Sequence, residues 1–250
     1  MITKAEIRLI RSLDDKRART DEGLFVAEGE KWIAELCASP LRVRRIYALP
    51  GHFADDPRTT VVSPAEMERI SCLKTPNNSL ALVELPRRTF DPAALRGRLT
   101  LALDEVRNPG NLGTIIRLAD WFGIERILCS AGSADCFNPK VVQASMGALL
   151  RVEVHYVDLP AVLAAARRDG VAVYGTFLEG DDLYRTGFAP EEGIIVLGNE
   201  GSGIRPETEA HVSHKLFIPP YPAGRAGSES LNVAMAAGII CAEFRRRAVR

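Results

Sequence analysis

Residues 99–122, LTLALDEVRNPGNLGTIIRLADWF, decide the fold class. An apolar run from Leu99 to Val106 predicts a buried strand, and the apolar spacing from Thr114 to Phe122 predicts a helix that Gly123 ends. Between them lies the polar segment 108–113, which we expect to be a loop. A strand that enters a helix through a short loop is the repeating unit of a parallel α/β sheet.

The same alternation continues to the end of the chain and predicts a mostly parallel sheet covered by helices on both faces. We expect further strands at 126–129, 152–157, 171–176, 194–197 and 215–218, with helices at 139–149, 161–168 and 230–247.

The first 85 or so residues form a smaller pattern of their own. Thr3 and Glu6 have the spacing of a capping box at the start of a helix, and short strands and helices alternate beyond it. The polar segment Pro86-Arg-Arg-Thr-Phe-Asp-Pro92 then interrupts the pattern, as domain boundaries do. We predict two domains, 1–88 and 97–250.

Composition narrows the possible partners without naming one. Lys and Arg number 32 and so do Asp and Glu, so an RNA partner would need local basic patches. One candidate patch contains Lys4, Arg8, Arg11, Lys16, Arg17 and Arg19, followed by Arg42, Arg44 and Arg45; a second contains Arg245, Arg246, Arg247 and Arg250. The alternative is that these side chains are merely solvated.

The chain has the features of a cytoplasmic protein. It contains five cysteines without a Cys-x-x-Cys pair, no apolar run near ~20 residues and no secretory signal at its start, so we expect reduced thiols and no membrane partner. The pair His211 and His214 forms no obvious cluster with cysteines or carboxylates, and we expect no metal site.

Three unusual loops follow strands whose carboxyl ends bind ligands in such sheets. The first, 108–113, carries two glycines and two asparagines before a helix start that could face an anion. Arg117 lies one turn into that helix, or simply on its wet side. The loop is not the G-x-G-x-x-G fingerprint, so nicotinamide dinucleotide binding gains no support.

The other two loops are also rich in glycine or proline. In 197–203, Leu-Gly-Asn-Glu-Gly-Ser-Gly, three glycines surround Glu200, which could equally be an exposed residue of a tight turn. In the third, Ser230 is a plausible cap or first-turn residue of the last helix. None of these loops contains a histidine, so Ser-His-Asp chemistry is excluded, and the residues alone do not name a reaction.

Together the three loops resemble the signature motifs of the SpoU (TrmH-like) family of RNA 2′-O-ribose methyltransferases, within the SPOUT superfamily. Asn108–Arg117 resembles the first motif, Leu197–Gly203 the second, and Ile218–Pro219 with Ser230–Val233 the third. The amino-terminal part, including 23–29, is similar to the ribosomal-protein-like (L30e-like) substrate-binding domain of some members.

The resemblance implies a fold and a chemistry. The fold is an α/β SPOUT domain with a parallel sheet and a deep carboxy-terminal trefoil knot, plus a small L30e-like α/β domain, assembled as a homodimer. S-adenosylmethionine is the methyl donor, and no metal is needed. The implied catalytic residues are Asn111, Arg117, Glu200, Ser230 and Asn232. The implied cofactor-binding residues are Leu197, Gly198, Asn199, Gly201, Ile218, Pro219 and Leu231.

These residue types suit methyl transfer to a hydroxyl, which needs in-line placement of the oxygen and a route for its proton. Because a guanidinium keeps its proton up to a pKa of about 12.5–13.8, we expect Arg117 to grip an RNA phosphate and stabilise the developing alkoxide. Glu200 or a water then accepts the proton. Two features depart from the family pattern: Pro220 replaces the usual methionine, and the segment 221–227, with Arg225, is longer.

The function predicted from sequence is therefore methylation of a ribose 2′-hydroxyl in structured RNA, with 23S rRNA favoured. The alternatives are a tRNA 2′-O-methyltransferase, a non-catalytic RNA-binding protein that kept the fold, and an α/β enzyme that binds another nucleotide.

Overall fold

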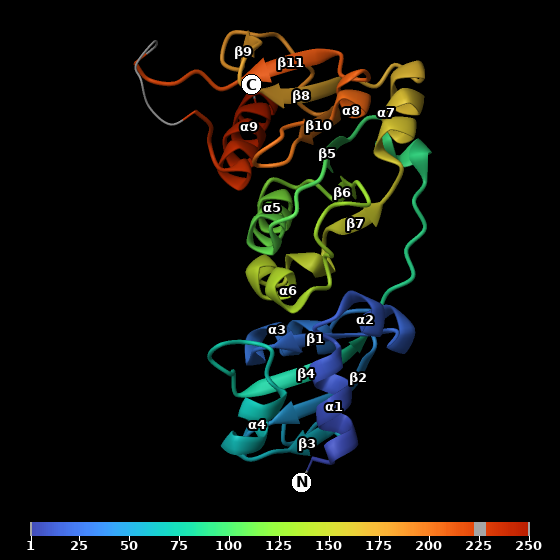
Figure 1. Ribbon diagram of the computed structural model, residues 1–250, viewed down its shortest axis with the longest axis vertical. Coiled ribbons are helices and arrows are strands. Elements are labelled where there is room, and N and C mark those ends of the chain that lie inside the picture. Colours follow the sequence, from blue (N-terminus) through green and yellow to red (C-terminus); the bar gives the residue numbers. More distant parts are fainter. Residues whose placement is uncertain (1, 223–228, 250) are drawn as a thin grey trace. The chain divides into compact units, whose positions relative to one another are not determined.

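The computed structural model describes residues 2–222 and 229–249, and the chain divides into two compact units (Figure 1). The first unit contains Met1–Arg87 and Asp135–Leu150, and the second contains Arg88–Ala134 and Arg151–Arg250. The segment 221–227 that departs from the family pattern, including Arg225, lies mostly outside the described residues.

The first unit is built on a four-stranded sheet in the order β1-β4-β2-β3. β4 is antiparallel to both β1 and β2, and β3 pairs with β2 in parallel. Its strands are Leu24–Glu28 (β1), Val43–Ala48 (β2), Thr59–Val61 (β3) and Ser79–Glu84 (β4). Its helices are Lys4–Ser12 (α1), Lys16–Glu22 (α2), Glu30–Cys37 (α3), Pro64–Ile70 (α4) and Pro139–Ser145 (α6), with the 3₁₀ helix Ala148–Leu150 (η2).

The amino-terminal helix begins as predicted, because the Thr3 hydroxyl accepts the Glu6 N–H while the Glu6 carboxylate accepts the Thr3 N–H. Ile10 and Leu13, at the end of this helix, pack into a buried apolar cluster with residues of β1, β4 and α4.

Arg19 does not belong to an exposed basic patch, and its assignment there is wrong. Its side chain is 2% exposed, donates to the carbonyl oxygens of Leu13 and Asp14, and forms an ion pair with Asp135. The pair joins the segment 135–150 to α2, which lies more than 100 positions earlier in the chain. Lys4, Arg8, Lys16 and Arg44 remain exposed.

The second unit contains a seven-stranded sheet in the order β7-β6-β5-β10-β8-β11-β9, and every pair of neighbours is parallel. The predicted parallel sheet is therefore confirmed. The strands are Leu99–Leu103 (β5), Arg126–Cys129 (β6), Glu153–Tyr156 (β7), Val173–Phe177 (β8), Asp181–Asp182 (β9), Gly193–Leu197 (β10) and His214–Phe217 (β11).

Helices cover both faces of this sheet, with α5 and α9 on one side and α7 and α8 on the other (Figure 1). On the α7 face, Leu159 and Leu163 pack against strand residues such as Ala102 and Val196. The elements are Pro92–Leu95 (η1), Pro109–Trp121 (α5), Leu159–Arg168 (α7), Pro206–Glu209 (α8) and Val233–Ala248 (α9). Among the described residues, no helix combines the length and the apolar character that crossing a membrane requires.

The second predicted basic patch is largely engaged within the chain at its three described members, Arg245, Arg246 and Arg247, while Arg250 lies outside the described residues. Arg245 donates to the carbonyl oxygen of Phe122. Arg247 donates to those of Leu183 and Thr186, and both Arg246 and Arg247 pair with the buried carboxylate of Glu243.

We predict that Glu243→Gln lowers the Tm by about 5 °C at neutral pH, since it leaves two arginines without their carboxylate. Hydrogen bonds from Arg246, and then from Arg247, lower the pKa of Glu243 from 4.5 to about 2 against the effect of burial. The stabilisation is therefore fully present above about pH 4.5 and is lost as the pH falls toward 2. The Tm values of wild type and Glu243→Gln, measured by thermal unfolding between pH 7 and pH 2.5, test this loss of stabilisation.

The control is Glu209→Gln, which removes the exposed pair with Lys215 and should change the Tm little at any pH. A Tm difference between wild type and Glu243→Gln that stayed constant down to pH 2.5 would contradict the role given to the carboxylate.

Candidate active site

The first loop motif begins a helix. Pro109 is the first residue of α5, and the Asn108 side chain caps the helix by accepting the N–H groups of Gly110 and Asn111 at 2.8 and 3.2 Å. The prediction of a loop over 108–113 is therefore wrong. An asparagine cap followed by proline favours a helix start more strongly than the two glycines oppose it.

Three predicted catalytic residues meet at the starts of α5 and α9. Asn111 Nδ2 donates to Glu200 Oε1 at 2.6 Å, and Asn232 Nδ2 donates to Asn111 Oδ1 at 3.0 Å. Asn232 Oδ1 in turn caps α9 by accepting the N–H groups of Ala234 and Met235. Its role as the cap of α9 thus orients the Asn232 amide. The Asn232 amide in turn orients that of Asn111, which holds the Glu200 carboxylate. We call Asn111, Glu200 and Asn232 the polar triad.

The second motif is a tight turn that points Glu200 at Asn111. The backbones of Asn199 and Gly203 bond in both directions at 2.9 and 3.0 Å, and Asn199 Oδ1 accepts the N–H groups of Gly201 and Ser202. Asn199 Nδ2 donates to the carbonyl oxygen of Glu105 at 2.8 Å, which fixes the turn to the end of β5. The turn is tight, as one reading of the sequence expected, and Glu200 also has a defined partner.

Arg117 lies apart from the polar triad. It is six residues beyond Asn111 on α5, or about 9 Å along the helix axis, and is exposed. Among the residues that the structure describes, it has no hydrogen-bond or ion-pair partner.

Ser230 is exposed and precedes the helix rather than capping it, because Asn232 is the cap of α9. Its prediction as a cap or first-turn residue is wrong. The structure therefore brings together Asn111, Glu200 and Asn232, but not Arg117 and Ser230.

The predicted cofactor-binding residues follow the ends of β10 and β11, which flank β8 in the sheet. Leu197 is the last residue of β10 and is buried, Ile218 and Pro219 follow β11, and Leu231 is 51% exposed just before α9. Their contact with a cofactor stays a prediction. Within the described parts of the chain, no three His, Cys, Asp or Glu side chains gather as metal ligands would.

Sequence reasoning missed the loop that follows β8, although β8 ends between β10 and β11. Leu178 is exposed there, and a Cβ at Gly180 would lie 2.6 Å from the carbonyl oxygen of Lys215. The signal that could have found it is the same as for the other loops, namely an apolar strand that runs directly into Leu-Glu-Gly.

Comparison with known proteins identifies the family of the chain. Residues 98–242 match the model of the SpoU rRNA Methylase family, and residues 4–81 match the MRM3-like substrate binding domain. The chain belongs to the SpoU rRNA methylase family. Over 94% of both chains it is 31% identical to the 23S rRNA (guanosine(2553)-2′-O)-methyltransferase RlmP of Bacillus subtilis.

Solved structures of SpoU-type proteins match nearly the whole chain. A putative RNA methyltransferase of the TrmH family from Porphyromonas gingivalis is 40% identical with a TM-score of 0.88, covering 99% of each chain. The AdoMet-bound rRNA methyltransferase from Sinorhizobium meliloti is 28% identical with a TM-score of 0.85, covering 99% of this chain and 96% of the other.

We predict that Gly198→Ala destabilises the second unit, because a Cβ there would lie 2.6 Å from the carbonyl oxygen of Gly203. Backbone cannot yield as a flexible side chain can, so we expect the free energy of unfolding to fall by about 1–3 kcal/mol. Denaturant unfolding measures the change.

Gly201→Ala is the matched control, since its Cβ would meet only Asn199 Oδ1, at 3.6 Å. It should change stability by less than about 0.5 kcal/mol. Equal effects of the two substitutions would show that the close approach at Gly198 does not constrain the turn.

Proposed function

We propose that this SpoU-family chain is an enzyme that transfers a methyl group from S-adenosylmethionine to the ribose 2′-hydroxyl of a nucleotide in structured RNA, with 23S rRNA as the substrate. The observation that carries the proposal is the polar triad, in which residues from three separate motifs hydrogen-bond to one another. The match to RlmP over 94% of both chains supports rRNA over tRNA.

The loops after β8, β10 and β11 fit S-adenosylmethionine in chemistry. Leu178 and Leu231 expose apolar side chains that can cover an adenine, while the turn 198–203 presents glycine backbone. We assign cofactor contacts to Leu197, Gly198, Asn199, Gly201, Ile218, Pro219 and Leu231. When bound, the cofactor supplies an electrophilic methyl group on a sulfonium.

The polar triad handles the proton of the ribose hydroxyl. Asn111 occupies Oε1 of Glu200, and Oε2 has no hydrogen-bond partner among the described residues, so this oxygen can accept the proton directly or through water. Arg117 holds an RNA phosphate and stabilises the developing alkoxide, because a guanidinium is a strong bidentate donor and a very poor base. Ser230 positions the ribose near the cofactor.

The first predicted domain, 1–88, binds RNA as an L30e-like module, and the second, 97–250, is catalytic. The match of residues 4–81 to a substrate binding domain supports the first assignment. Lys4, Arg8 and Arg44 are exposed and can contact phosphates.

We further assign the family's knot and homodimer to this protein, which we expect to work in the cytoplasm, where the predicted rRNA substrate is made. The chain leaves β10, passes beyond β8 and enters β11 on its other side, which is compatible with a knotted path. α5 and α9 pack together and expose Trp121 (84%) and Met235 (62%), as a subunit interface would.

The methyl-transfer test uses purified protein, radiolabelled S-adenosylmethionine and unmodified transcripts of 23S rRNA and of tRNA. We expect label in 23S rRNA, and we expect Arg117→Ala to lower kcat/KM about 100-fold through the loss of alkoxide stabilisation. For Arg117→Lys we expect kcat/KM to fall about tenfold, because lysine cannot make a bidentate contact.

The control for these variants is Arg168→Ala, which removes an exposed arginine from α7 and should leave kcat/KM unchanged. Label in tRNA alone would show that the substrate is tRNA rather than 23S rRNA. Failure to label either RNA would favour a non-catalytic RNA-binding protein, and near-normal turnover by Arg117→Lys would overturn the role of Arg117.

The homodimer is tested separately by Met235→Glu, which places a charge on the exposed face of α9. We expect analytical ultracentrifugation to show a dimer for wild type and a monomer for the variant, since burying an unpaired carboxylate is unfavourable. Val61→Glu adds the same charge at an exposed apolar residue of β3 and should remain dimeric. A wild-type monomer at micromolar concentration would exclude the proposed assembly.

A further inference from the structure

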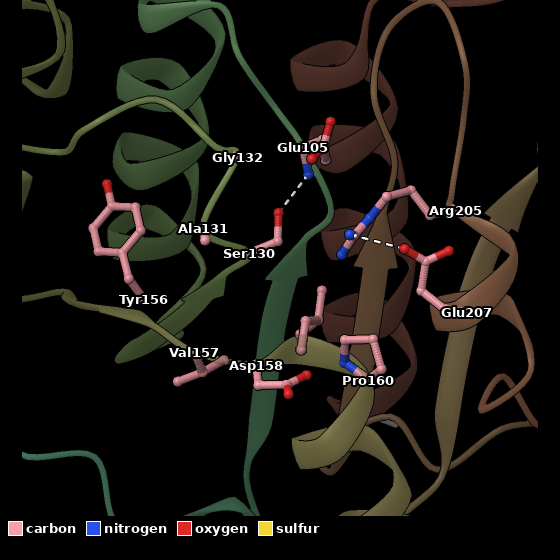
Figure 2. A pocket seen from close by; sticks show the side chains of 11 residues that line it. Glu105, Ser130, Ala131, Gly132, Tyr156, Val157, Asp158, Pro160, Arg205 and Glu207 are labelled. Carbon is pink, nitrogen blue, oxygen red and sulfur yellow. Dashed lines mark hydrogen bonds and ion pairs between the residues drawn. The ribbon is translucent and has the colours of Figure 1, made fainter.

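A cavity of about 570 Å³ opens at the carboxyl ends of β5, β6 and β7, in the second unit (Figure 2). Its volume is in the range of small-ligand sites. Six side chains supply its chemistry: Glu105, Ser130, Tyr156, Asp158, Arg205 and Glu207. The triad residues do not line it, so the proposed methyl transfer leaves the cavity unexplained.

Glu105 is held at one edge of the cavity in an unusual conformation. Its φ is +59°, in the left-handed region, and its N–H donates to Ser130 Oγ at 2.8 Å (Figure 2). Its carboxylate is paired with Arg107. A Cβ at Gly132 would lie 2.8 Å from Glu105 Cδ, so the carboxylate in this conformation packs directly over Gly132.

Arg205 lines the cavity on the same side as Glu105 (Figure 2). Asp104 is fully buried and accepts both the N–H of Arg205, at 2.9 Å, and its Nε–H, at 2.8 Å. The guanidinium also contacts Glu207 at 2.9 Å. Burial alone would lower the pKa of Arg205, but the hydrogen bond and the charge of Asp104 raise it above its ordinary value. The guanidinium of Arg205, which keeps its charge and donates hydrogen bonds, therefore lies beside the Glu207 carboxylate, which accepts them.

Tyr156 and Asp158 form the remaining wall. The Tyr156 hydroxyl donates to the carbonyl oxygen of Ala134 at 2.5 Å, which fixes the ring while leaving the side chain 37% exposed. Asp158 caps α7 with Oδ1, which accepts the N–H of Ala161 at 3.3 Å. An aromatic ring held by such a hydrogen bond is a surface on which a base can stack.

The cavity is joined to the polar triad through Glu105. The carbonyl oxygen of Glu105 accepts Asn199 Nδ2 at 2.8 Å, and Asn199 is followed by Glu200. A nucleotide in the cavity would therefore lie beside the loop that carries the proposed proton acceptor.

We propose that this cavity takes a guanine base of the substrate RNA, either that of the methylated nucleotide or that of its immediate neighbour. The inference rests on the function proposed above and deepens it. Carboxylates accept hydrogen bonds and repel phosphate, so an uncharged base edge rich in donors fits where the RNA backbone does not.

Guanine alone among the four bases has two adjacent donors, N1–H and N2–H, together with the acceptors O6 and N7. The donors match Asp158 and Glu207, and the acceptors match Arg205. Adenine would turn its N1 acceptor toward the carboxylates, and uracil and cytosine have only one ring-edge donor group each. Tyr156 stacks on the base.

The test first maps the methylated nucleotide of a 23S rRNA transcript by mass spectrometry. Short RNAs then carry inosine in place of guanosine at that position or at either neighbour, which removes only the N2 amino group. We expect inosine at one of the three positions to lower wild-type kcat/KM about tenfold or more. The position that responds identifies which base occupies the cavity.

The paired variant is Asp158→Asn with Glu207→Gln. Asparagine also caps helices well, so α7 should persist, and an unchanged dissociation constant for S-adenosylmethionine checks the fold. We expect this variant to lose activity on the guanosine RNA and to treat inosine and guanosine within about twofold. Glu209→Gln, on the same helix as Glu207 but outside the cavity, should keep the wild-type discrimination.

Three results would overturn the inference: no guanosine at any of the three positions, wild-type tolerance of inosine at all of them, or unchanged discrimination in the double variant. In each case methylation itself still occurs, so the proposed function stands. Absence of methylation by wild type on every RNA would instead overturn the proposed function and this inference together.

Discussion

The hydrogen bond from Asn111 Nδ2 to Glu200 Oε1 joins segments 89 residues apart in the chain, and the geometry of the candidate site depends on it. It forms because β5 and β10 are neighbours in register, with Leu103 opposite Leu197, so that the residues following both strands emerge at one edge of the sheet. Asn232 then fixes the orientation of the Asn111 amide, since the oxygen of Asn111 must face the Asn232 amino group. The carboxylate is thus positioned by two helix starts and one strand pair, all of which form without substrate.

Much of this could be predicted from the sequence, because the signals are local. The apolar runs at 99–106 and 194–197 predict strands, which the structure places at 99–103 and 193–197, and a polar, glycine-rich segment after each strand predicts ligand-binding loops at one edge of the sheet. The identity of Asn111, Glu200 and Asn232 as site residues came from the resemblance of three motifs. Their hydrogen bonds to one another could not be derived, since each depends on how the strands are ordered in the sheet.

The sequence predictions fail where they depend on contacts between residues far apart in the chain, or on weighing one local signal against another. Arg19 looks like a solvated cation, yet it is buried because Asp135 and two carbonyl oxygens satisfy its donors. The two glycines of 108–113 favour a helix start at Thr114, five residues after the observed start at Pro109, and hide the capping signal of Asn108. The cavity could not be predicted either, because Glu105, Ser130 and Tyr156 come from the ends of three strands, Arg205 lies at the start of α8, and the four share no common motif.

The separation of Arg117 from the polar triad bears on how the proposed chemistry would be controlled. The triad is preorganised by its own hydrogen bonds, which do not depend on RNA to form. Arg117, exposed and without a partner among the described residues, can contribute only when a phosphate reaches it. An RNA whose base fills the cavity but whose phosphate does not reach Arg117 would then lie beside Glu200 without the stabilising contact of the guanidinium. Selectivity would arise from the requirement that base and phosphate be placed together, since neither contact alone completes the site.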